Sequence, residues 1–489
     1  MTRSINLFPD QSEHIQNVRH ALKTHKRVLM QAATGWGKTI GAGYMMTEAA
    51  KKGNSCFFVV PRRQLLAQTA ESLASYGVSF GYIAAGYKPN PFQMIQLCTS
   101  GTLARRLDKL PFIPKIVFID ETHFGGAELD AIIQFFTALG CIIIGLSATP
   151  LKISGRHMSD WYDHMVVGPQ IRFLMDAGRL SDYRLLAPSK PDLSSVAVRN
   201  GEYVESQLAD RMEQDTVLTG DMVRHYKAQA MGKLNIAFGV SIKHAELMAD
   251  AFRDGGVPAA AVHSKMSDDD IKARIKAFAR RELLALVGKD LMTFGFDLAS
   301  AAGMDVTPEV MTDGRPTESL PLQLQKWGRV LRRKPFPALI LDHAGNSVKP
   351  DGSLKHGYPD DDRDWNLDRE EKKRGSGAEK TIPVRQCSQC YMVHRPSPQC
   401  PACGFVYPIA DRTIEQVEGD LVEVTREQLA DVAKQERMVQ GRADTFESLL
   451  ELERRKGAKK GWAEHVWVSR GNSKYGLAER RAKWRASVS

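Results

Sequence analysis

A glycine-rich loop near the amino terminus holds the first residues whose types and spacing predict chemistry. The stretch "QAATGWGKTI", from Gln31 to Ile40, follows the apolar run "RVLM" and precedes a segment with helical spacing. Backbone N–H groups at such a helix start can face phosphate oxygens, a lysine can hold the β- and γ-phosphates, and a threonine hydroxyl can ligate Mg²⁺. The alternative is a glycine turn that happens to precede Lys-Thr. The strand–loop–helix context favours a nucleotide loop. The predicted nucleotide-binding residues in it are Thr34, Gly35, Gly37, Lys38 and Thr39, with Thr39 also a magnesium ligand.

Two positions in this loop are unusual. Ala32 stands where the usual loop has its first glycine, and Trp36 lies between the two later glycines. Because the backbone of such a loop holds the phosphates, the side chain of Trp36 is free to point away. We assign it no role.

Two adjacent carboxylates end an apolar strand further along the chain. The run "KIVFIDETH", from Lys115 to His123, places Asp120 and Glu121 directly after the strand. Two acids emerging from an apolar strand are costly unless they meet a cation. We predict that Asp120 holds Mg²⁺, directly or through water, and that Glu121 orients and deprotonates an attacking water. The alternative is an ordinary strand-end turn, which a phosphate loop in the same lobe disfavours.

Four of the seven cysteines form a compact cluster. Cys387 and Cys390 are followed by nine residues and then by Cys400 and Cys403. Two such knuckles bring four thiolates to a tetrahedral site, and so small a loop hardly folds without metal, so we predict Zn²⁺. Disulfides are the alternative, and a cytoplasmic location disfavours them. His394 is expected at the surface rather than on the metal. The unit can contact nucleic acid or protein, or serve only as a structural staple.

Short apolar runs alternate with helical stretches over two parts of the chain. The first round, from Arg27 to about Pro150, includes "CFFVV" and "CIIIGLSAT", and the second begins near Leu234 with "LNIAFGVS". Continuous apolar strands separated by helices favour parallel sheets covered on both faces. The predicted fold class is therefore α/β, with two tandem parallel-sheet lobes and a cleft between them.

These changes of pattern divide the chain into six segments. The polar stretch that begins "KPDGSLKHGYPDDDRDW" is typical of a linker or surface arm. The predicted segments are a first, ATP-binding lobe at 1–165, a connecting segment at 166–225, a second lobe at 226–348, a linker at 349–382, a four-cysteine zinc ribbon at 383–410 and a basic, mainly helical accessory region at 411–489.

The composition is that of a soluble globular protein with a basic balance. Hydrophobic residues make up 43% of the chain and charged residues 25%, with a formal net charge of +10. This charge suits a polyanionic partner, although it does not by itself identify one. No apolar run approaches the roughly 18 residues that span a bilayer, and the amino terminus has no apolar core of signal-peptide length. We expect no membrane partner and a cytoplasmic location.

The carboxyl-terminal stretch combines cations with aromatic rings. From Arg454 to the end there are eleven Lys and Arg and two Glu, interleaved with Trp462, Trp467, Tyr475 and Trp484. Cations for phosphates and rings for bases predict a nucleic-acid surface. The alternative is a solvated basic helical domain whose tryptophans form its own core, and the sequence does not choose between them.

In their order along the chain, these motifs resemble those of superfamily 2 helicases of the DEAD/DEAH-box (DExH) class. "DETH" is similar to motif II and "SAT" at 147–149 to motif III, and Ala32 is what the family's phosphate loop commonly has. The other motifs resemble the adenine-contacting glutamine in "LFPDQ", motif Ia in "VVPRRQLLAQ", motif Ib in "TSGTLARR", motif IV in "IAFGVSIKHAELMADAF", motif V in "LMTFGFD" and motif VI in "QKWGRVLRR". The resemblance covers about the first 350 residues. The nearest likeness is to phage, prophage and bacterial proteins related to repair and restriction helicases.

The resemblance implies two RecA-like lobes with ATP and Mg²⁺ between them. It implies nucleic acid, DNA in preference to RNA, lying across both lobes. The sequence also departs from the family pattern before motif V, where Gly288 and Lys289 stand; Lys289 either adds a phosphate contact or disturbs the nucleic-acid surface. The roles that the resemblance implies are adenine contact by Gln11, nucleotide contact by Gly295 and Asp297 of motif V, contact with the γ-phosphate or its water by Gln325, and stabilisation of the transferred charge by Arg329 and Arg332.

The function these residues predict is that of an ATP hydrolase that moves along or remodels nucleic acid. The expected location is a bacterial cytoplasm or nucleoid, with a phage as a possible source of the gene. One alternative is a translocase on duplex or branched DNA that does not separate strands. A second is a nucleic-acid-binding recruiter with vestigial hydrolysis. A protein partner at the zinc ribbon or the carboxyl-terminal region stays open.

Overall fold

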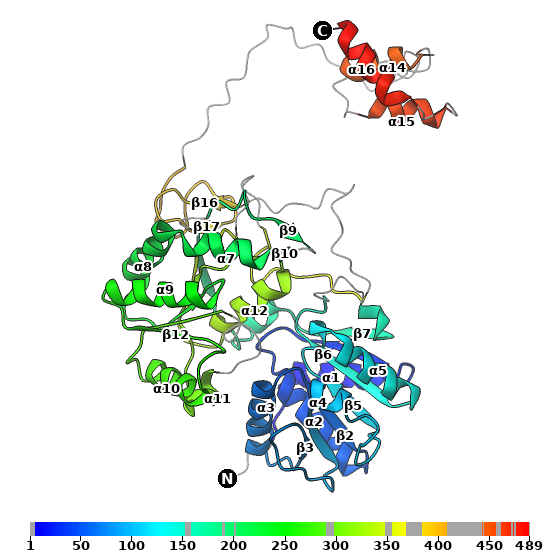
Figure 1. Cartoon of the computed structure of the whole chain (residues 1–489), viewed down its shortest axis with the longest axis vertical. Coiled ribbons are helices and arrows are strands. Elements are labelled where there is room, and N and C mark those ends of the chain that lie inside the picture. The colour runs from blue at the N-terminus through cyan, green and yellow to red at the C-terminus, as the bar shows by residue number, and fades with distance from the viewer. Residues whose placement is uncertain are drawn as a thin grey trace. The chain divides into compact units, whose positions relative to one another are not determined.

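The chain folds into two compact units, which are described separately. The computed structural model describes residues 5–151, 158–187, 191–199, 202–289, 298–347, 355–367, 384–407, 443, 445–455, 461–470, 473 and 476–488. The first unit is Met1–Pro408 and the second is Ile409–Ser489. Figure 1 shows the first unit as a blue-to-cyan lobe and a green lobe, each built around a sheet.

The first lobe is a seven-stranded parallel sheet with the order β3-β4-β2-β5-β6-β1-β7. Its central strands are apolar along their whole length because both faces are covered. The carboxyl ends of β1 and β5 therefore bring the phosphate loop and the paired carboxylates to one edge of the sheet. The strands are β1 (Arg27–Gln31), β2 (Cys56–Val60), β3 (Gly81–Ile83), β4 (Ile95–Thr99), β5 (Ile116–Ile119), β6 (Ile142–Ser147) and β7 (His164–Val167).

Helices cover both faces of this sheet. The faces are distinguished by two apolar clusters, one containing residues of the first three helices and the other containing residues of α4, α5 and the segment 158–162. The helices are α1 (Pro9–Ala21), α2 (Lys38–Lys51), α3 (Arg63–Ser75), α4 (Ser100–Ala104) and α5 (Ala127–Ala138), with short 3₁₀ turns at Thr122–Phe124 and Met158–Asp160 and α6 (Ile171–Asp176) leading to the second lobe.

The second lobe is a six-stranded parallel sheet with the order β12-β13-β11-β14-β15-β8. One face packs against α7, α8 and α9, and the other against α10, α11 and α12. The strands are β8 (Tyr183–Leu186), β11 (Asn235–Phe238), β12 (Ala259–Val262), β13 (Ala285–Gly288), β14 (Val310–Asp313) and β15 (Ala338–Asp342). The helices are α7 (Glu205–Glu213), α8 (Thr216–Ala230), α9 (Ile242–Asp254), α10 (Asp268–Ala279), α11 (Leu298–Ala302) and α12 (Leu320–Val330).

Sequence patterning predicted the fold class correctly, and both lobes are parallel sheets. In the two large sheets, four short strands escaped notice, namely β3, β7, β8 and β14. Two of them do not respect the domain limits drawn from the sequence. β7 crosses position 165, and β8, inside the segment 166–225, pairs with β15 of the second sheet.

A small antiparallel hairpin follows the first strand of the second lobe in the sequence. It consists of β9 (Val198–Arg199) and β10 (Glu202–Tyr203), and it follows β8 and precedes α7. The hairpin forms a sheet of its own rather than extending either large sheet.

A strap of residues 355–367 runs from the second lobe back to the first. Lys355 pairs with Glu318 at 2.7 Å beside the second sheet, while Leu367 accepts hydrogen bonds from Met158 (3.1 Å) and Ser159 (3.4 Å) in the first lobe. Its Trp365 is buried. The segment 349–382, predicted to be a linker or surface arm, thus includes a packed part, because this polar stretch carries a few aromatic residues that the apolar face of the lobes covers.

The zinc-ribbon segment packs against the second lobe. Its hairpin consists of β16 (Arg385–Gln386) and β17 (Val393–His394). Met392 forms an antiparallel bridge with Leu186 of β8, and the N–H of Ala187 donates to the carbonyl of Tyr391 at 3.2 Å. β8 is an edge strand of the second sheet, so the ribbon satisfies backbone groups that an edge strand otherwise exposes.

The described part of the second unit is helical, as the sequence predicted. Its helices are α14 (Phe446–Arg455), α15 (Trp462–Ser469) and α16 (Leu477–Val488). Trp462, Trp467 and Trp484 are half-buried against a core that contains Phe446. This packing supports the interpretation in which the tryptophans help to form the unit's own core. Tyr475 lies outside the described residues.

None of the helices that the structure describes combines the length and hydropathy that crossing a membrane requires.

Candidate nucleotide site and metal centre

The phosphate loop joins β1 to α2 through left-handed glycines. Gly35 and Gly37 have φ values of 86° and 98°, which side-chain-bearing residues rarely adopt, and Gly37 is the N-cap of α2. A β-carbon at Gly35 would lie 2.6 Å from Leu180 of the segment that leads to the second lobe. Lys38 and Thr39 therefore begin a helix whose free N–H groups face outward, the arrangement that binds anions.

Trp36 has a structural role that sequence analysis did not assign. Its side chain is 1% exposed, its indole N–H donates to Asp10 at 3.0 Å, and its ring edge packs on His14 with centroids 5.2 Å apart. Gly41 of α2 lies so close that a β-carbon there would be 2.9 Å from the ring. The side chain points into the protein, where it packs between α1 and α2, and it thereby holds the phosphate loop in place.

Gln11, predicted to contact adenine, lies beside the same loop. Its side-chain amide donates to the carbonyl of Trp36 at 2.6 Å, and its oxygen accepts from the N–H of Phe8 at 2.9 Å. Phe8 is 52% exposed, and the guanidinium of Arg179 lies 4.7 Å from its ring centroid. Arg179 also pairs with Asp10 at 2.6 Å. Sequence analysis missed Phe8 and Arg179, and Arg179 had no motif around it to mark it.

Asp120 is buried and Glu121 is half-buried where β5 ends. Burial and the neighbouring Glu121 charge raise the pKa of Asp120 to about 7. Burial alone would raise the pKa of Glu121, but nearby charges, that of Lys38 first and that of Arg329 among the others, lower it. Lys38 Nζ lies 3.8 Å from Glu121 Oε1. The backbone of Glu121 is left-handed, with a φ of 47°, and such strain in a residue with a side chain is typical of functional sites.

His123 connects the carboxylates to the second lobe. The ring is fully buried, and burial lowers its pKa, so it is neutral near pH 7. Its Nδ1 lies 3.0 Å from Ser147 Oγ, and its Nε2 lies 3.0 Å from the amide nitrogen of Gln325 in α12. One tautomer fits both distances, with Nδ1–H donating to Ser147 and Nε2 accepting from Gln325. Motifs II, III and VI thus meet at one imidazole, which sequence analysis did not include among the site residues.

Helix α12 lies directly against the phosphate loop. A β-carbon at Gly328 would lie 2.8 Å from the β-carbon of Thr34, so only glycine fits there without a shift. Arg329 is close enough to Glu121 for its charge to lower that carboxyl's pKa. Arg332 lies beyond the end of α12, and its backbone bridges to Leu180. The structure therefore brings Gln325 and Arg329 to the site, and places Arg332 beside the segment that joins the lobes.

A fully buried ion pair, also missed by sequence analysis, holds α12 on the second sheet. Lys326 Nζ lies 2.8 and 2.7 Å from the two carboxylate oxygens of Asp313 at the end of β14. Asn346 and Gln323 donate to the same carboxylate at 3.0 and 3.2 Å. A buried charge pair needs such additional hydrogen bonds to offset its desolvation.

Motif V, residues 291–297, lies outside the described residues, and with it Gly295 and Asp297. Lys289 forms an ion pair with Glu205 at the start of α7. The sequence left open whether Lys289 adds a phosphate contact or disturbs the nucleic-acid surface. In the structure its partner is a carboxylate of the protein.

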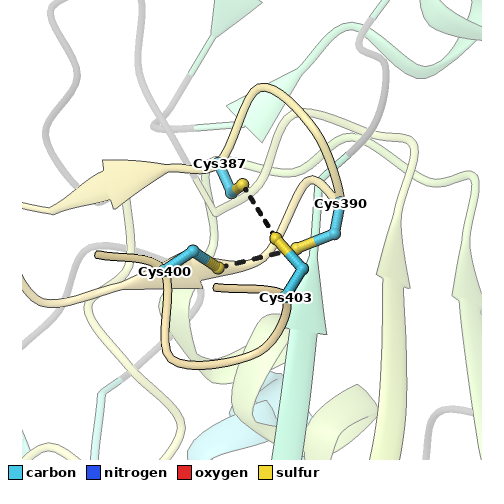
Figure 2. A group of neighbouring side chains, drawn as sticks. All are labelled: Cys387, Cys390, Cys400 and Cys403. Atoms are coloured by element: carbon cyan, nitrogen blue, oxygen red, sulfur yellow. Dashed lines mark hydrogen bonds between the residues drawn. The ribbon is translucent and has the colours of Figure 1, made fainter. Parts of the chain in front are cut away.

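The four cysteines come together as predicted, and Figure 2 shows their sulfurs converging from the two knuckles. All four sulfurs lie within 4.8 Å of one another, and the pairs Cys387–Cys403 and Cys390–Cys400 are 3.6 Å apart. Tetrahedral zinc with Zn–S bonds of about 2.3 Å requires sulfurs roughly 3.8 Å apart, whereas a disulfide requires about 2 Å. The donor set therefore fits a metal.

The prediction that His394 is a surface residue was wrong. The side chain is 6% exposed, its Nε2 lies 2.6 Å from the hydroxyl of Tyr407, and its Nδ1 lies 2.7 Å from the carbonyl of Arg395. Both ring nitrogens are engaged, so the imidazole supports the ribbon's fold. A lone histidine between the knuckles gave no sign of the Tyr407 contact in the sequence.

Comparisons with known proteins agree with this geometry. The family model for "Type III restriction enzyme, res subunit" matches residues 4–152. A "51.5 kDa protein" of a Lactococcus phage is 27% identical over 389 residues, which is 78% of this chain and 79% of that protein. The putative mitochondrial ATP-dependent helicase irc3 of Schizosaccharomyces pombe is 23% identical over 325 residues, covering 60% of this chain and 51% of its own.

Among solved structures, the crystal structure of the DUF1998 helicase MrfA bound to DNA has a similar fold. Its TM-score is 0.50 at 14% identity, and the match covers 70% of this chain and 49% of that one. Two parallel-sheet lobes, with motifs I, II, III and VI meeting where the lobes touch, are the architecture of this chain. In its motifs, in its fold and in these relatives, the chain is similar to the superfamily 2 helicases.

Proposed function

We propose that this chain is an ATP-dependent motor that moves along or remodels DNA. The observation that carries the proposal is the contact between His123 and Gln325, which ties the carboxylates of the first lobe to α12 of the second at 3.0 Å. Phosphates held at Lys38 would lie between Glu121 and Arg329. Because both lobes then contact the same nucleotide, its hydrolysis changes what holds the lobes together.

The residues divide the chemistry between the lobes. Lys38 and the N-terminal N–H groups of α2 bind the phosphates, and Glu121 accepts the proton of the attacking water. Arg329 approaches from the second lobe and stabilises the charge that develops during transfer. Thr39 and Asp120 would hold Mg²⁺, which neutralises phosphate charge when bound. Gln325, hydrogen-bonded to His123, would report the state of the phosphates to the second lobe.

The choice of DNA rests on resemblance. The matched family model is named for restriction enzymes, and MrfA, which has a similar fold, was solved bound to DNA. The basic charge of the chain suits either nucleic acid. Strand separation, as distinct from movement along an intact duplex, has no feature in its favour among the described residues, so the two are outcomes of one experiment.

We also propose that the four cysteines bind Zn²⁺ as a structural staple. The ribbon packs on edge strand β8 through Tyr391 and Met392, which directly follow the first knuckle. Metal binding would therefore fix a segment that closes the edge of the second sheet.

The role of Glu121 is tested by Glu121→Gln, which keeps the side chain's shape and removes the base. We expect ATP affinity to stay within about threefold of the unsubstituted chain and turnover to fall by roughly 10²–10⁴-fold. Single-turnover hydrolysis and binding of a fluorescent ATP analogue measure the two quantities. Glu48→Gln, a surface change on α2, is the matched control. Near-normal turnover in Glu121→Gln would remove Glu121 as the base.

The nucleic-acid substrate is tested by ATPase stimulation with single-stranded, duplex, forked and RNA oligonucleotides of matched sequence. We expect DNA to stimulate more than RNA, and DNA binding to weaken steeply with salt. Unwinding of the forked duplex would identify strand separation. Lys38→Ala should abolish stimulation in every case. Equal stimulation by duplex without unwinding would identify a duplex translocase. Nucleic-acid binding without any ATP hydrolysis would leave only the alternative of a nucleic-acid-binding recruiter.

The pKa of Asp120 predicts how Mg²⁺ affinity depends on pH. Because that pKa is raised to about 7, Mg²⁺ must displace a proton below pH 7 and none above it. The apparent Mg²⁺ affinity in nucleotide binding should therefore fall as pH drops, approaching about tenfold per pH unit below 7, and level off above it. Asp120→Asn should flatten the profile. A profile of the unsubstituted chain that is flat between pH 6 and 8 would contradict the assignment.

The metal site is tested by the metal content of the purified chain. We expect one zinc per chain, lost in Cys400→Ser and kept in Cys141→Ser, a control at a buried cysteine outside the cluster. Loss of zinc should also increase hydrogen exchange at Leu186 and Ala187, whose backbone the ribbon covers. Equal zinc in the two variants would rule out the proposed site.

A further inference from the structure

In the β9–β10 hairpin, the carboxylate of Glu202 accepts hydrogen bonds from the loop that precedes α12. Oε1 of Glu202 accepts from the backbone N–H of Glu318 at 3.0 Å, and Oε2 accepts from that of Ser319 at 3.2 Å. Oε2 also accepts from the hydroxyl of Thr317, and Oε1 from the N–H of Tyr203 at 2.9 Å. Four donors on one carboxylate are a charge-assisted cluster, stronger than the same number of neutral hydrogen bonds.

This loop is the start of the helix that reaches the nucleotide site. Ser319 is the N-cap of α12, and its hydroxyl accepts from the N–H of Leu322 at 3.4 Å. Gln325 and Arg329 follow on the same helix, about 9 and 15 Å along its axis at 1.5 Å per residue. Because a helix of this length is rigid, a shift or rotation of its first turn moves both side chains with respect to His123 and Glu121.

The hairpin that supplies Glu202 belongs to neither large sheet. It lies in the chain between β8, the first strand of the second lobe, and α7. Thr317 has other partners, since its N–H donates to Asn346 at 2.9 Å and its carbonyl lies 3.0 Å from Nε2 of His356 in the strap. The N–H of Ser319 also donates to Thr317 Oγ1 at 2.9 Å. The loop is thus held without Glu202, and what the carboxylate adds is an acceptor for the N–H of Glu318 and a second acceptor for that of Ser319 at the helix cap.

We propose that Glu202 is a positioning residue for the motif VI helix, acting through the N-cap loop of α12 to hold Arg329 and Gln325 at the nucleotide site. The inference rests on the proposed ATPase function and adds a residue outside the family motifs named above. Its effect is on the chemical step. Nucleotide binding is left to the phosphate loop of the first lobe, which Glu202 does not contact.

The first experiment compares Glu202→Gln with Glu282→Gln, the same change at an exposed surface pair in the second lobe. Whichever way the new amide turns, its NH₂ group faces donors that the carboxylate satisfied. We expect kcat of DNA-stimulated hydrolysis to fall about tenfold in Glu202→Gln, with the affinity for a fluorescent ATP analogue unchanged. A kcat equal to that of Glu282→Gln would overturn the inference.

The second experiment is a double-substitution cycle with Arg329→Ala, read as kcat. If Glu202 acts through Arg329, adding Glu202→Gln to Arg329→Ala lowers kcat little further. If the two effects multiply, Glu202 acts independently of Arg329 and the inference is wrong. Should Glu202→Gln fail to fold by circular dichroism, Glu202→Asp, which keeps the charge and shortens its reach, takes its place in the cycle with the same two outcomes.

The two levels of proposal fail differently. If the unsubstituted chain hydrolyses no ATP with any nucleic acid, the proposed function is wrong and the role of Glu202 falls with it. If the unsubstituted chain is active and Arg329→Ala is impaired while Glu202→Gln is normal, the function stands and only the role of Glu202 is lost.

Discussion

The close approach of α12 to the phosphate loop is the contact on which the rest of this architecture depends. Gly328 lies against Thr34 with no room for a β-carbon, so the helix backbone itself packs on the loop. Gln325 and Arg329 lie on either side of that contact and reach His123 and Glu121 of the first lobe. A nucleotide that binds to or leaves the phosphate loop therefore changes where α12 can lie. In this way a nucleotide can control the contact between the two lobes.

Buried charge accompanies this contact on both sides. In the first lobe, Asp120 and Glu121 are adjacent carboxyl groups at least partly removed from water, and Lys38 and Arg329 partly compensate their charge. In the second, Lys326 and Asp313 form a fully buried pair with further hydrogen bonds from the residues around them. Neither arrangement is explained by stability alone, because apolar side chains of the same volume usually serve a core as well or better. They specify where α12 and the strand ends must meet.

The chain joins its lobes more than once. The direct connection runs through α6 and Leu180, which packs on Gly35. The strap 355–367 returns from the second lobe to the first, where Leu367 binds Met158 and Ser159. Between these connections the β9–β10 hairpin holds the cap of α12. Relative movement of the lobes must therefore be accommodated by the segment around Leu180 and by the strap.

The sequence by itself determined the local chemistry: the phosphate loop at 32–39, the carboxylates after "KIVFI", the cysteine knuckles and the parallel α/β pattern. These follow from spacing along the chain, since a strand, a turn and a helix are set within about 30 residues of one another. Only the tertiary structure decided that His123 meets Gln325, 202 residues away, that Lys326 pairs with Asp313, that Trp36 and His394 are buried, and that Glu202 caps the loop before α12. The physical reason is that burial and hydrogen-bond partners depend on how the lobes, the hairpin and the ribbon pack against one another. The periodicity of residues along the chain carries no information about this packing.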